Sequence, residues 1–256
     1  MGINVSIPEL ARVTETGRYS LVVPETISVI FTGELAKGVS VMDAAFCYLK
    51  SAHGIKRKAV EFYCPQLSQH EKEVLCSMAC LTGAFTAGIA EEKPVLAQTL
   101  DLSQVKPMIM MPCSAREEQG KAELCEKDVV AGIELNAGQI GGYTGGTIEE
   151  LRKAAELMEG KKLSLGFRLS ICPATSQDYL QAADEGLLEK FIDFGAQIHG
   201  AGDHSVVVQG PGAMGPREKL ITTGLYTFAG AMGCDDAQIY SGSVETVMEA
   251  AAAKRM

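Results

Sequence analysis

The sequence predicts an α/β fold in which mainly parallel sheets are covered by helices, arranged as two α/β/α layered domains. Stretches rich in Val, Ile and Phe alternate with helical patterns along the chain, which is typical of βα units. With 256 residues, the chain is long enough for one large or two ordinary domains whose cores need no disulfides. Around residues 101–113, two prolines occur without helical periodicity, which predicts a crossover near residue 105. We therefore expect one domain in residues 1–105 and a second in residues 106–256.

The first half of the chain contains the expected elements of consecutive βα units. Residues 26–33 (TISVIFTG) are typical of a strand, and Ser40 with Asp43 forms a capping-box-like start for a helix that ends at Gly54. Further along, the pattern predicts a strand over 58–64, a helix that begins at Ser68 and ends at Gly83, and a short strand over 85–90.

The second half repeats this alternation. Its pattern predicts a strand over 131–140, a helix over 148–160, a strand over 163–172, and then a helix that carries Leu180, Ala183, Leu187 and Phe191. Glycine and proline dominate residues 199–216, so the backbone there must bend sharply or lie close to another group. This loop is the segment most typical of a functional site.

Composition and charge exclude several classes of partner. The formal net charge is -9 at pH 7, which repels phosphate backbones and anionic bilayers, so neither nucleic acid nor a membrane is expected as a partner. No segment approaches the roughly 20 uninterrupted apolar residues of a membrane span. The 8 cysteines, several of them within apolar runs, are typical of reduced, buried thiols. The first residues lack a basic region followed by an apolar stretch, so we expect a cytoplasmic protein.

Two loops are expected to form a ligand site. In a parallel sheet the ligand crevice lies beyond the carboxyl ends of the strands, where residues 141–147 and 173–176 fall. Both loops lead into helix N-termini, whose N–H groups and dipole favour an anion. The residues expected to hold a small anionic metabolite are Thr144, Gly145, Gly146, Thr147, Thr175, Ser176 and Ser205. A second interpretation is that Thr147 and Glu150 form a capping box and that the glycines serve only tight turns.

Asp203, His204 and Ser205 are candidate functional groups inside the glycine-rich loop. Adjacent loop residues point to different sides, so three neighbours cannot form a Ser-His-Asp relay by themselves. His204 can act as an acid or a base near neutral pH, and Asp203 either binds a metal or a donor or caps the loop.

The sequence predicts no metal and no cofactor. His53, His70 and His199 stand without partners of recognisable spacing and are interpreted as ordinary surface or core residues. Cys76 and Cys80 face the same way on a predicted helix, but two thiols are too few for a closed zinc site, so packing is the favoured interpretation.

Four segments, taken in order, resemble the large subunit of the aconitase and isopropylmalate dehydratase superfamily. ISVIFTGELAKGVSVMDAAFCYL resembles the opening of that family's second domain, and AVEFYCPQLSQHEKEVLCSMACLTGA resembles the helix with its Cys-Asn-Met stretch. IGGYTGGTIEELRKAAELMEGKKL resembles the Ile-Gly-Ser-Cys-Thr-Asn-Gly segment, and FAGAMGCDDAQIYSGSVETVMEAA resembles the family's terminal region. The resemblance covers nearly the whole chain and implies an aconitase-like fold.

The same resemblance shows where this chain departs from the family. A [4Fe–4S] cluster that leaves one iron open for substrate needs three thiolates, and the resemblance places Tyr143, Asp203 and Val206 at those positions. The family's active-site Asn and Glu and its two carboxylate-binding arginines are replaced here by Ser77, Leu81, Tyr226 and Ala231. From the resemblance we also expect no counterpart of the family's first domain or of its small domain in these 256 residues. We therefore expect no aconitase-type cluster.

Three functions follow from these observations. The first is a cluster-free, lyase-like enzyme or enzyme subunit that binds a small carboxylate or phosphate anion in the cleft between the domains. Tyr143 or His204 would transfer a proton and Asp203 would orient that group. The alternative is a catalytically inactive scaffold or partner subunit of a separately encoded aconitase-like protein, because a chain without the first domain exposes the surface that this domain covers. The third is a 3-isopropylmalate dehydratase-type [4Fe–4S] hydro-lyase that uses Cys76 and Cys80.

Overall fold

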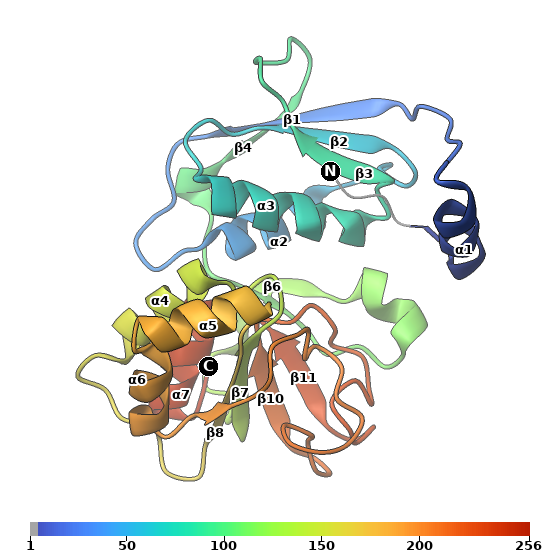
Figure 1. Ribbon diagram of the computed structural model, residues 1–256. Coiled ribbons are helices and arrows are strands. Elements are labelled where there is room, and N and C mark those ends of the chain that lie inside the picture. Colours follow the sequence, from blue (N-terminus) through green and yellow to red (C-terminus); the bar gives the residue numbers. More distant parts are fainter. Residues whose placement is uncertain (1–4) are drawn as a thin grey trace. The chain divides into compact units, whose positions relative to one another are not determined.

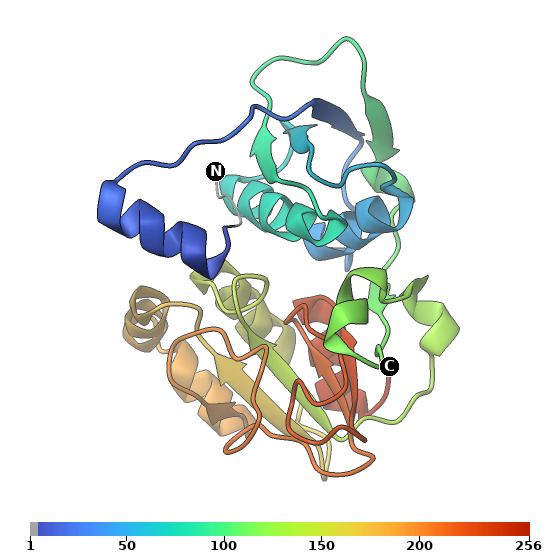
Figure 2. The same ribbon diagram turned by 90° about the vertical axis from the view of Figure 1, so that its right-hand side faces the viewer.

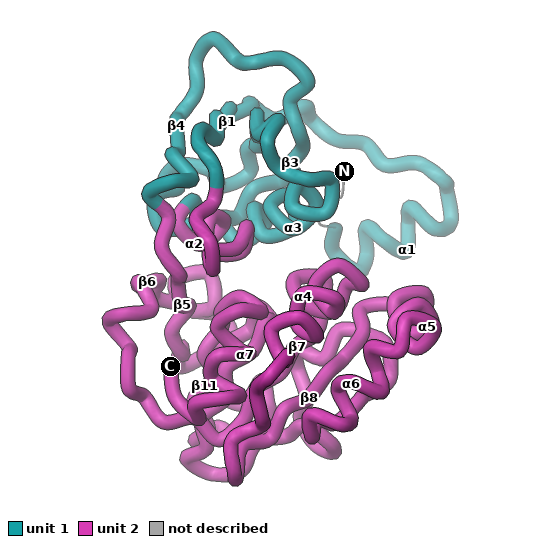
Figure 3. Tube along the Cα trace, turned by 90° about the vertical axis from the view of Figure 1, so that its left-hand side faces the viewer, with its two compact units in different colours: residues 1–34, 48–104 teal, residues 35–47, 105–256 magenta. Residues whose placement is uncertain are grey.

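The computed structural model describes residues 5–256 and divides the chain into two compact units (Figure 3). The first unit contains the described residues up to Glu34 and residues 48–104, and the second contains residues 35–47 and 105–256. The division expected from the sequence, at residue 105, assigns residues 35–47 to the first domain. They lie with the second unit, where the buried Asp43 accepts a hydrogen bond at Oδ1 from Met108 N (2.8 Å).

A 4-stranded parallel sheet with the strand order β3-β2-β1-β4 forms the first unit. Its strands are β1 (Thr26–Thr32), β2 (Ala59–Tyr63), β3 (Thr86–Ile89) and β4 (Gln98–Asp101). The helical segments are α1 (Ile7–Thr16), α2 (Val41–Ser51, divided between the units), α3 (Gln69–Ala79), η1 (Cys80–Thr82) and η2 (Leu102–Gln104). Helix α3 lies along one face of the sheet (Figure 1).

The local signals in the first unit act as the sequence predicts. Ser68 caps α3 through its side chain, and the side chain of Glu71 accepts a hydrogen bond from Ser68 N (2.7 Å). The ring of Phe62 packs against Phe31 (centroids 5.7 Å apart) and, edge to face, against Tyr48 (5.2 Å). Apolar strand residues thus meet the helix layer, as expected for a βα unit.

The second unit is built on a 7-stranded sheet with the order β6-β5-β11-β10-β7-β8-β9. β11, β10, β7, β8 and β9 run parallel to one another, and β5 and β6 are antiparallel to their neighbours. The strands are β5 (Met108–Met110), β6 (Leu124–Glu126), β7 (Ala137–Gly141), β8 (Arg168–Cys172), β9 (Gln197–Ile198), β10 (Lys219–Thr222) and β11 (Gln238–Ser241). The predicted α/β class with mainly parallel sheets is confirmed.

The two faces of this second sheet are covered differently. The segments around it are η3 (Arg116–Lys121), η4 (Lys127–Val130), α4 (Ile148–Met158), α5 (Ser176–Asp184), α6 (Leu187–Phe194) and α7 (Val244–Ala253). Ile221 belongs to the core beneath α4 and α7, whereas its neighbour Leu220 belongs to a second cluster with Met214 and Met232 from the loops. Helices therefore cover one face and loops the other, where a second helix layer was expected (Figures 1 and 2).

Three predicted elements in this unit differ from the structure. The strand predicted over 163–172 begins only at Arg168, after a turn in which Phe167 N donates to Ser164 O. Strand β7 begins only at Ala137, because the preceding backbone pairs with the C-terminus, with Gly132 N donating to Met256 O and Leu135 N to Lys254 O. The single helix predicted through Phe191 is two helices, α5 and α6, which are separated at Gly186 in the left-handed conformation (φ 71°). Throughout the described residues, every helix is too short or too polar to cross a lipid bilayer.

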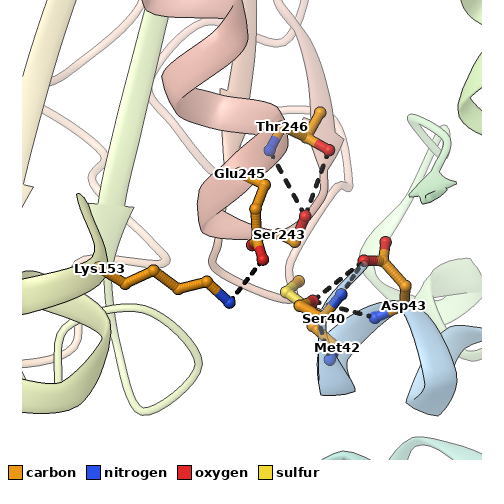
Figure 4. A network of polar contacts seen from close by, with 7 residues as sticks. All are labelled: Ser40, Met42, Asp43, Lys153, Ser243, Glu245 and Thr246. Carbon is orange, nitrogen blue, oxygen red and sulfur yellow. Dashed lines mark hydrogen bonds and ion pairs between the residues drawn. The ribbon is translucent and has the colours of Figure 1, made fainter. Parts of the chain in front are cut away.

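A buried polar network joins separate segments of the second unit (Figure 4). Asp43 Oδ2 accepts hydrogen bonds from Ser40 N (2.8 Å) and Ser40 Oγ (3.0 Å). Nearby, Lys153 Nζ pairs with Glu245 Oε1 (2.5 Å), while the buried Glu245 Oε2 has no hydrogen-bond partner among the described residues. Burial raises the pKa of Asp43 to about 6, and the charge of Glu245 acts in the same direction.

This network predicts a pH-dependent contribution to stability. The pKa of Asp43 is about 6 in the folded chain against 3.8 as its ordinary value, so the folded state binds the proton more tightly than the unfolded state does. The free energy of unfolding should therefore fall as the pH rises from about 4 to about 6, by up to about 3 kcal/mol from this group. Urea denaturation of the wild type and of Asp43→Asn should show a larger wild-type advantage at low pH. A difference between the two proteins that does not change with pH would contradict this assignment.

Candidate functional site

The carboxyl ends of three neighbouring strands define one edge of the second sheet. Gly141 at the end of β7 pairs with Cys172 at the end of β8, and β10 runs beside β7 on its other side. The loop of residues 142–147 leaves this edge toward α4, and the loop of residues 173–175 leaves it toward α5. The two predicted ligand loops therefore leave the sheet at the same edge.

The glycines of the first loop are required by close backbone packing. A Cβ atom on Gly141 would lie 2.8 Å from Cys172 Cβ, and one on Gly146 would lie 2.8 Å from Ala174 N and closer still to Cys172 O. Gly146 N donates to Gly142 O, and Ala174 N donates to Gly146 O (both 2.7 Å). The two loops are thus held together through backbone contacts that leave no room for a side chain.

The predicted capping box between Thr147 and Glu150 does not form. Thr147 is the residue before α4 but makes no side-chain capping bond, and its buried Oγ1 has no hydrogen-bond partner among the described residues. Instead, Asp178 Oδ1 accepts a hydrogen bond from Ile148 N (3.0 Å). An acidic side chain of α5 therefore caps α4, a contact that a local sequence pattern cannot show.

Most groups predicted to hold an anion are used within the protein. Thr144 Oγ1 donates to Thr223 O (2.5 Å), and the amides of Gly145 (3.4 Å) and Gly146 (2.7 Å) donate to Gly142 O. Thr175 N donates to Asp178 Oδ2 (3.0 Å) in a capping box that opens α5, while Ser176 is exposed in its first turn. Loop amides are thus weak candidates for anion binding.

A pocket of about 430 Å³ lies beside this edge and contains the histidines of the glycine-rich loop. Its lining residues are His199, Asp203, His204, Val206, Val207, Val208, Gln209 and Pro211. The two imidazole rings have centroids 5.4 Å apart. Burial, and then the charge of His204, lowers the pKa of His199. The pocket can therefore present two imidazoles and a carboxylate to a ligand.

The position of Asp203 connects the pocket to the glycine loop. Asp203 Oδ1 accepts hydrogen bonds from Ser205 N (3.0 Å) and from Ser205 Oγ, and a Cβ on Gly142 would lie 3.3 Å from it. Tyr143 follows directly and is 44% exposed, outside the pocket lining. The structure thus brings Asp203 and Ser205 close to Gly142, in the loop that carries Tyr143, while His204 lines the pocket.

Two further residues at this edge were not predicted to be functional: Cys172 was not singled out as a candidate, and His199 was interpreted as an ordinary surface or core residue. One potential ligand atom each of Cys172, His199 and His204 lies within 4.8 Å of the others, although Cys172 precedes the histidines by a whole βα unit. Cys172 is fully buried, which raises the pKa of its thiol to about 12. The signal that could have found both residues is the parallel pairing of β8 with β9. This pairing brings Cys172, the last residue of β8, and His199, the residue after β9, to one edge of the sheet.

Together, the fold and this pocket define an α/β protein in which two histidines and an aspartate line a pocket at the carboxyl edge of a mainly parallel sheet. A sequence model of the aconitase family (aconitate hydratase) matches residues 97–254, so the chain belongs to the aconitase family.

Named relatives agree with that membership. The chain is 29% identical to the homoaconitase large subunit of Thermus thermophilus, over 98% of this chain and 65% of that protein. It is 28% identical to the 3-isopropylmalate dehydratase large subunit of Pyrococcus horikoshii, over 94% of this chain and 63% of that protein. The chain thus spans less than two thirds of the length of these relatives. A crystal structure of Thermococcus kodakaraensis aconitase X (holo-form) shares the fold, with a TM-score of 0.54 and 12% identity over 90% of this chain and 55% of that one.

The residues that the resemblance places at the family's cluster-ligand positions lack the chemistry of cluster ligands. These are Tyr143, Asp203 and Val206, which offer a phenol, a carboxylate and a hydrocarbon where a [4Fe–4S] cluster needs three thiolates. Within the described residues, the group of potential metal ligands at this edge contains a single cysteine, Cys172. Of the pair predicted on one helix, Cys80 lies just beyond the end of α3, and burial raises the pKa of Cys76 to about 11.

The packing of the glycine loop predicts that one glycine-to-alanine substitution destabilises the protein and that a second one does not. Gly146→Ala would force its Cβ against backbone atoms of the neighbouring loop, so we expect the free energy of unfolding to fall by about 1–3 kcal/mol. Gly200→Ala is the control, because a Cβ there meets no atom within 4 Å. Chemical denaturation of both variants measures the difference. Equal stability of the two variants would show that the loop packing is looser than described.

Proposed function

We propose that this chain is a cluster-free, lyase-like enzyme or enzyme subunit that binds a small carboxylate or phosphate anion in the pocket of its second unit. The observation that carries the proposal is the convergence of His199, Asp203 and His204 on one pocket at the carboxyl edge of the sheet. Sheets of this class bind ligands at that edge, and a pocket with a few convergent polar groups is suited to a small molecule.

In this proposal the imidazoles of His199 and His204 bind the anion, in place of the loop amides that were expected from the sequence. The amides of Gly146 and Thr175 already donate to acceptors of the chain, whereas the rings of His199 and His204 border the pocket. A carboxylate or phosphate between these rings would accept hydrogen bonds from their N–H groups. Its negative charge would also favour protonation of the rings, which strengthens the contact.

The proposed reaction class is elimination of water from a hydroxy acid, or the reverse addition. Such an elimination needs a base that removes a proton from the carbon beside the carboxylate and an acid that protonates the leaving hydroxyl group. His204 is suited to proton transfer because its imidazole can donate or accept a proton and borders the pocket, and Tyr143 is the second candidate. Asp203 would position these groups through its contacts with Ser205 and the glycine loop.

One observation favours the alternative of a non-catalytic partner subunit. Ala231, at a position where the resemblance places a substrate-binding arginine, is fully buried and offers no charge to a carboxylate. Two relatives are named large subunits, and the chain spans less than two thirds of their length, which supports a partner in either function. The dehydratase names are also consistent with the third function, but the absence of three thiolates at the ligand positions disfavours it.

A thermal-unfolding screen tests the pocket. Small di- and tricarboxylates and phosphate esters are added to the purified chain, once with a chelator and once with a divalent metal. A ligand at a hundredfold excess over its Kd should stabilise the wild type by about 2.7 kcal/mol. Asp203→Ala and His204→Gln should lose this shift, while His53→Gln, outside the pocket, should keep it. The proposal fails if no compound stabilises the wild type under either condition, or if the pocket variants respond as the wild type does.

A further inference from the structure

Three potential metal ligands from separate segments meet at the back of the pocket. Cys172 ends β8, His199 follows β9 directly, and His204 lies in the loop beyond. Their ligand atoms all lie within 4.8 Å of one another. A buried cysteine alone is usually a packing residue, but two imidazoles beside it create a different chemical environment.

The donor types indicate which metal would bind. One thiol and two imidazoles form a set that suits Zn²⁺ and related transition metals, whereas Mg²⁺ and Ca²⁺ require oxygen ligands. Tetrahedral bonds of about 2.0–2.3 Å place ligand atoms about 3.3–3.8 Å apart, so the group would contract by about 1 Å on binding. Both histidines are only partly buried and line an open pocket, so their rings have room to turn toward the buried Cys172. We propose that Cys172, His199 and His204 bind a single Zn²⁺-type transition-metal ion.

Polar side chains of the neighbouring strands contact the group. The side chain of Gln139, which is buried in β7, bonds to the thiol of Cys172 and donates from Nε2 to His204 O (2.9 Å). Ser170 Oγ lies 3.2 Å from His199 Nε2. Partners of this kind orient ligands in metal sites, and their loss typically lowers metal affinity about 10–100-fold.

The arrangement leaves the metal open on one side. His199 and His204 line the pocket, and Cys172, fully buried, does not. A tetrahedral ion with three protein ligands keeps one position for water or for a ligand. Here that position would face the pocket, where a carboxylate or phosphate could bind. This last step rests on the proposed function, whereas metal binding itself does not. With the metal bound, His204 serves as a ligand and proton transfer falls to Tyr143.

Metal titration of the full chain tests the site. The chelator-treated protein is titrated with Zn²⁺ by calorimetry and with Co²⁺ by absorption spectroscopy. We expect one ion per chain and a thiolate-to-cobalt charge-transfer band. Cys172→Ser should abolish the band, and this substitution, His199→Gln and His204→Gln should each weaken Zn²⁺ binding at least about 10-fold. Cys64→Ser and His53→Gln are matched controls from the first unit and should bind as the wild type does.

Several outcomes would overturn the proposal. These are no stoichiometric binding, a cobalt spectrum without the thiolate band, or control variants that lose as much affinity as the ligand variants. If circular dichroism shows that Cys172→Ser does not fold, His204→Gln decides, because its side chain is only partly buried. Metal binding without any anion-induced stabilisation would support the metal site and contradict the proposed function. Anion binding without metal binding would support the proposed function and contradict the metal site.

Discussion

The close approach of the β7 and β8 ends is the constraint on which the candidate site depends. Gly141 opposes Cys172, and Gly146 lies against the backbone that follows Cys172, so that two loops pack without intervening side chains. This contact determines where α4 begins and brings Asp178 of α5 to the first amide of α4. It also places Gly142 against Asp203, which joins the histidine loop to the same edge. One strand pairing thereby positions three loops.

Local patterns predicted the elements of this fold well where the causes are local. The apolar run of β1 and the capping box at Ser68 act over a few residues, so their outcome can be derived from the sequence. The patterns were wrong where tertiary contacts or a single backbone conformation decide. The segment before Ala137 pairs with the C-terminus, and Gly186 separates two helices whose apolar residues continue one period.

Only part of the candidate site could be predicted from the sequence, for a similar reason. The high glycine and proline content identified the loop with Asp203 and His204 as a candidate site, because such a composition is unusual inside a packed domain. Cys172 lies outside that loop and His199 only at its first residue, and their proximity to His204 arises from the β8–β9 register and not from their spacing. The expected anion-binding amides had a local signal, but hydrogen bonds across the loops use most of them. Whether a polar group is available to a ligand depends on its other partners.

The hydrogen bonds of Gln139 give its buried side-chain amide a single orientation. Its Oε1 accepts from Thr222 Oγ1 (2.8 Å), so its two amide hydrogens are the groups that face His204 O and Cys172. Its contact with the Cys172 thiol lowers the pKa of that thiol, against the larger, raising effect of burial. If the amide were rotated by 180°, Gln139 Oε1 would face His204 O, and two hydrogen-bond acceptors would repel each other. Through one buried amide, the sheet thus fixes the backbone of the loop residue that carries a pocket imidazole.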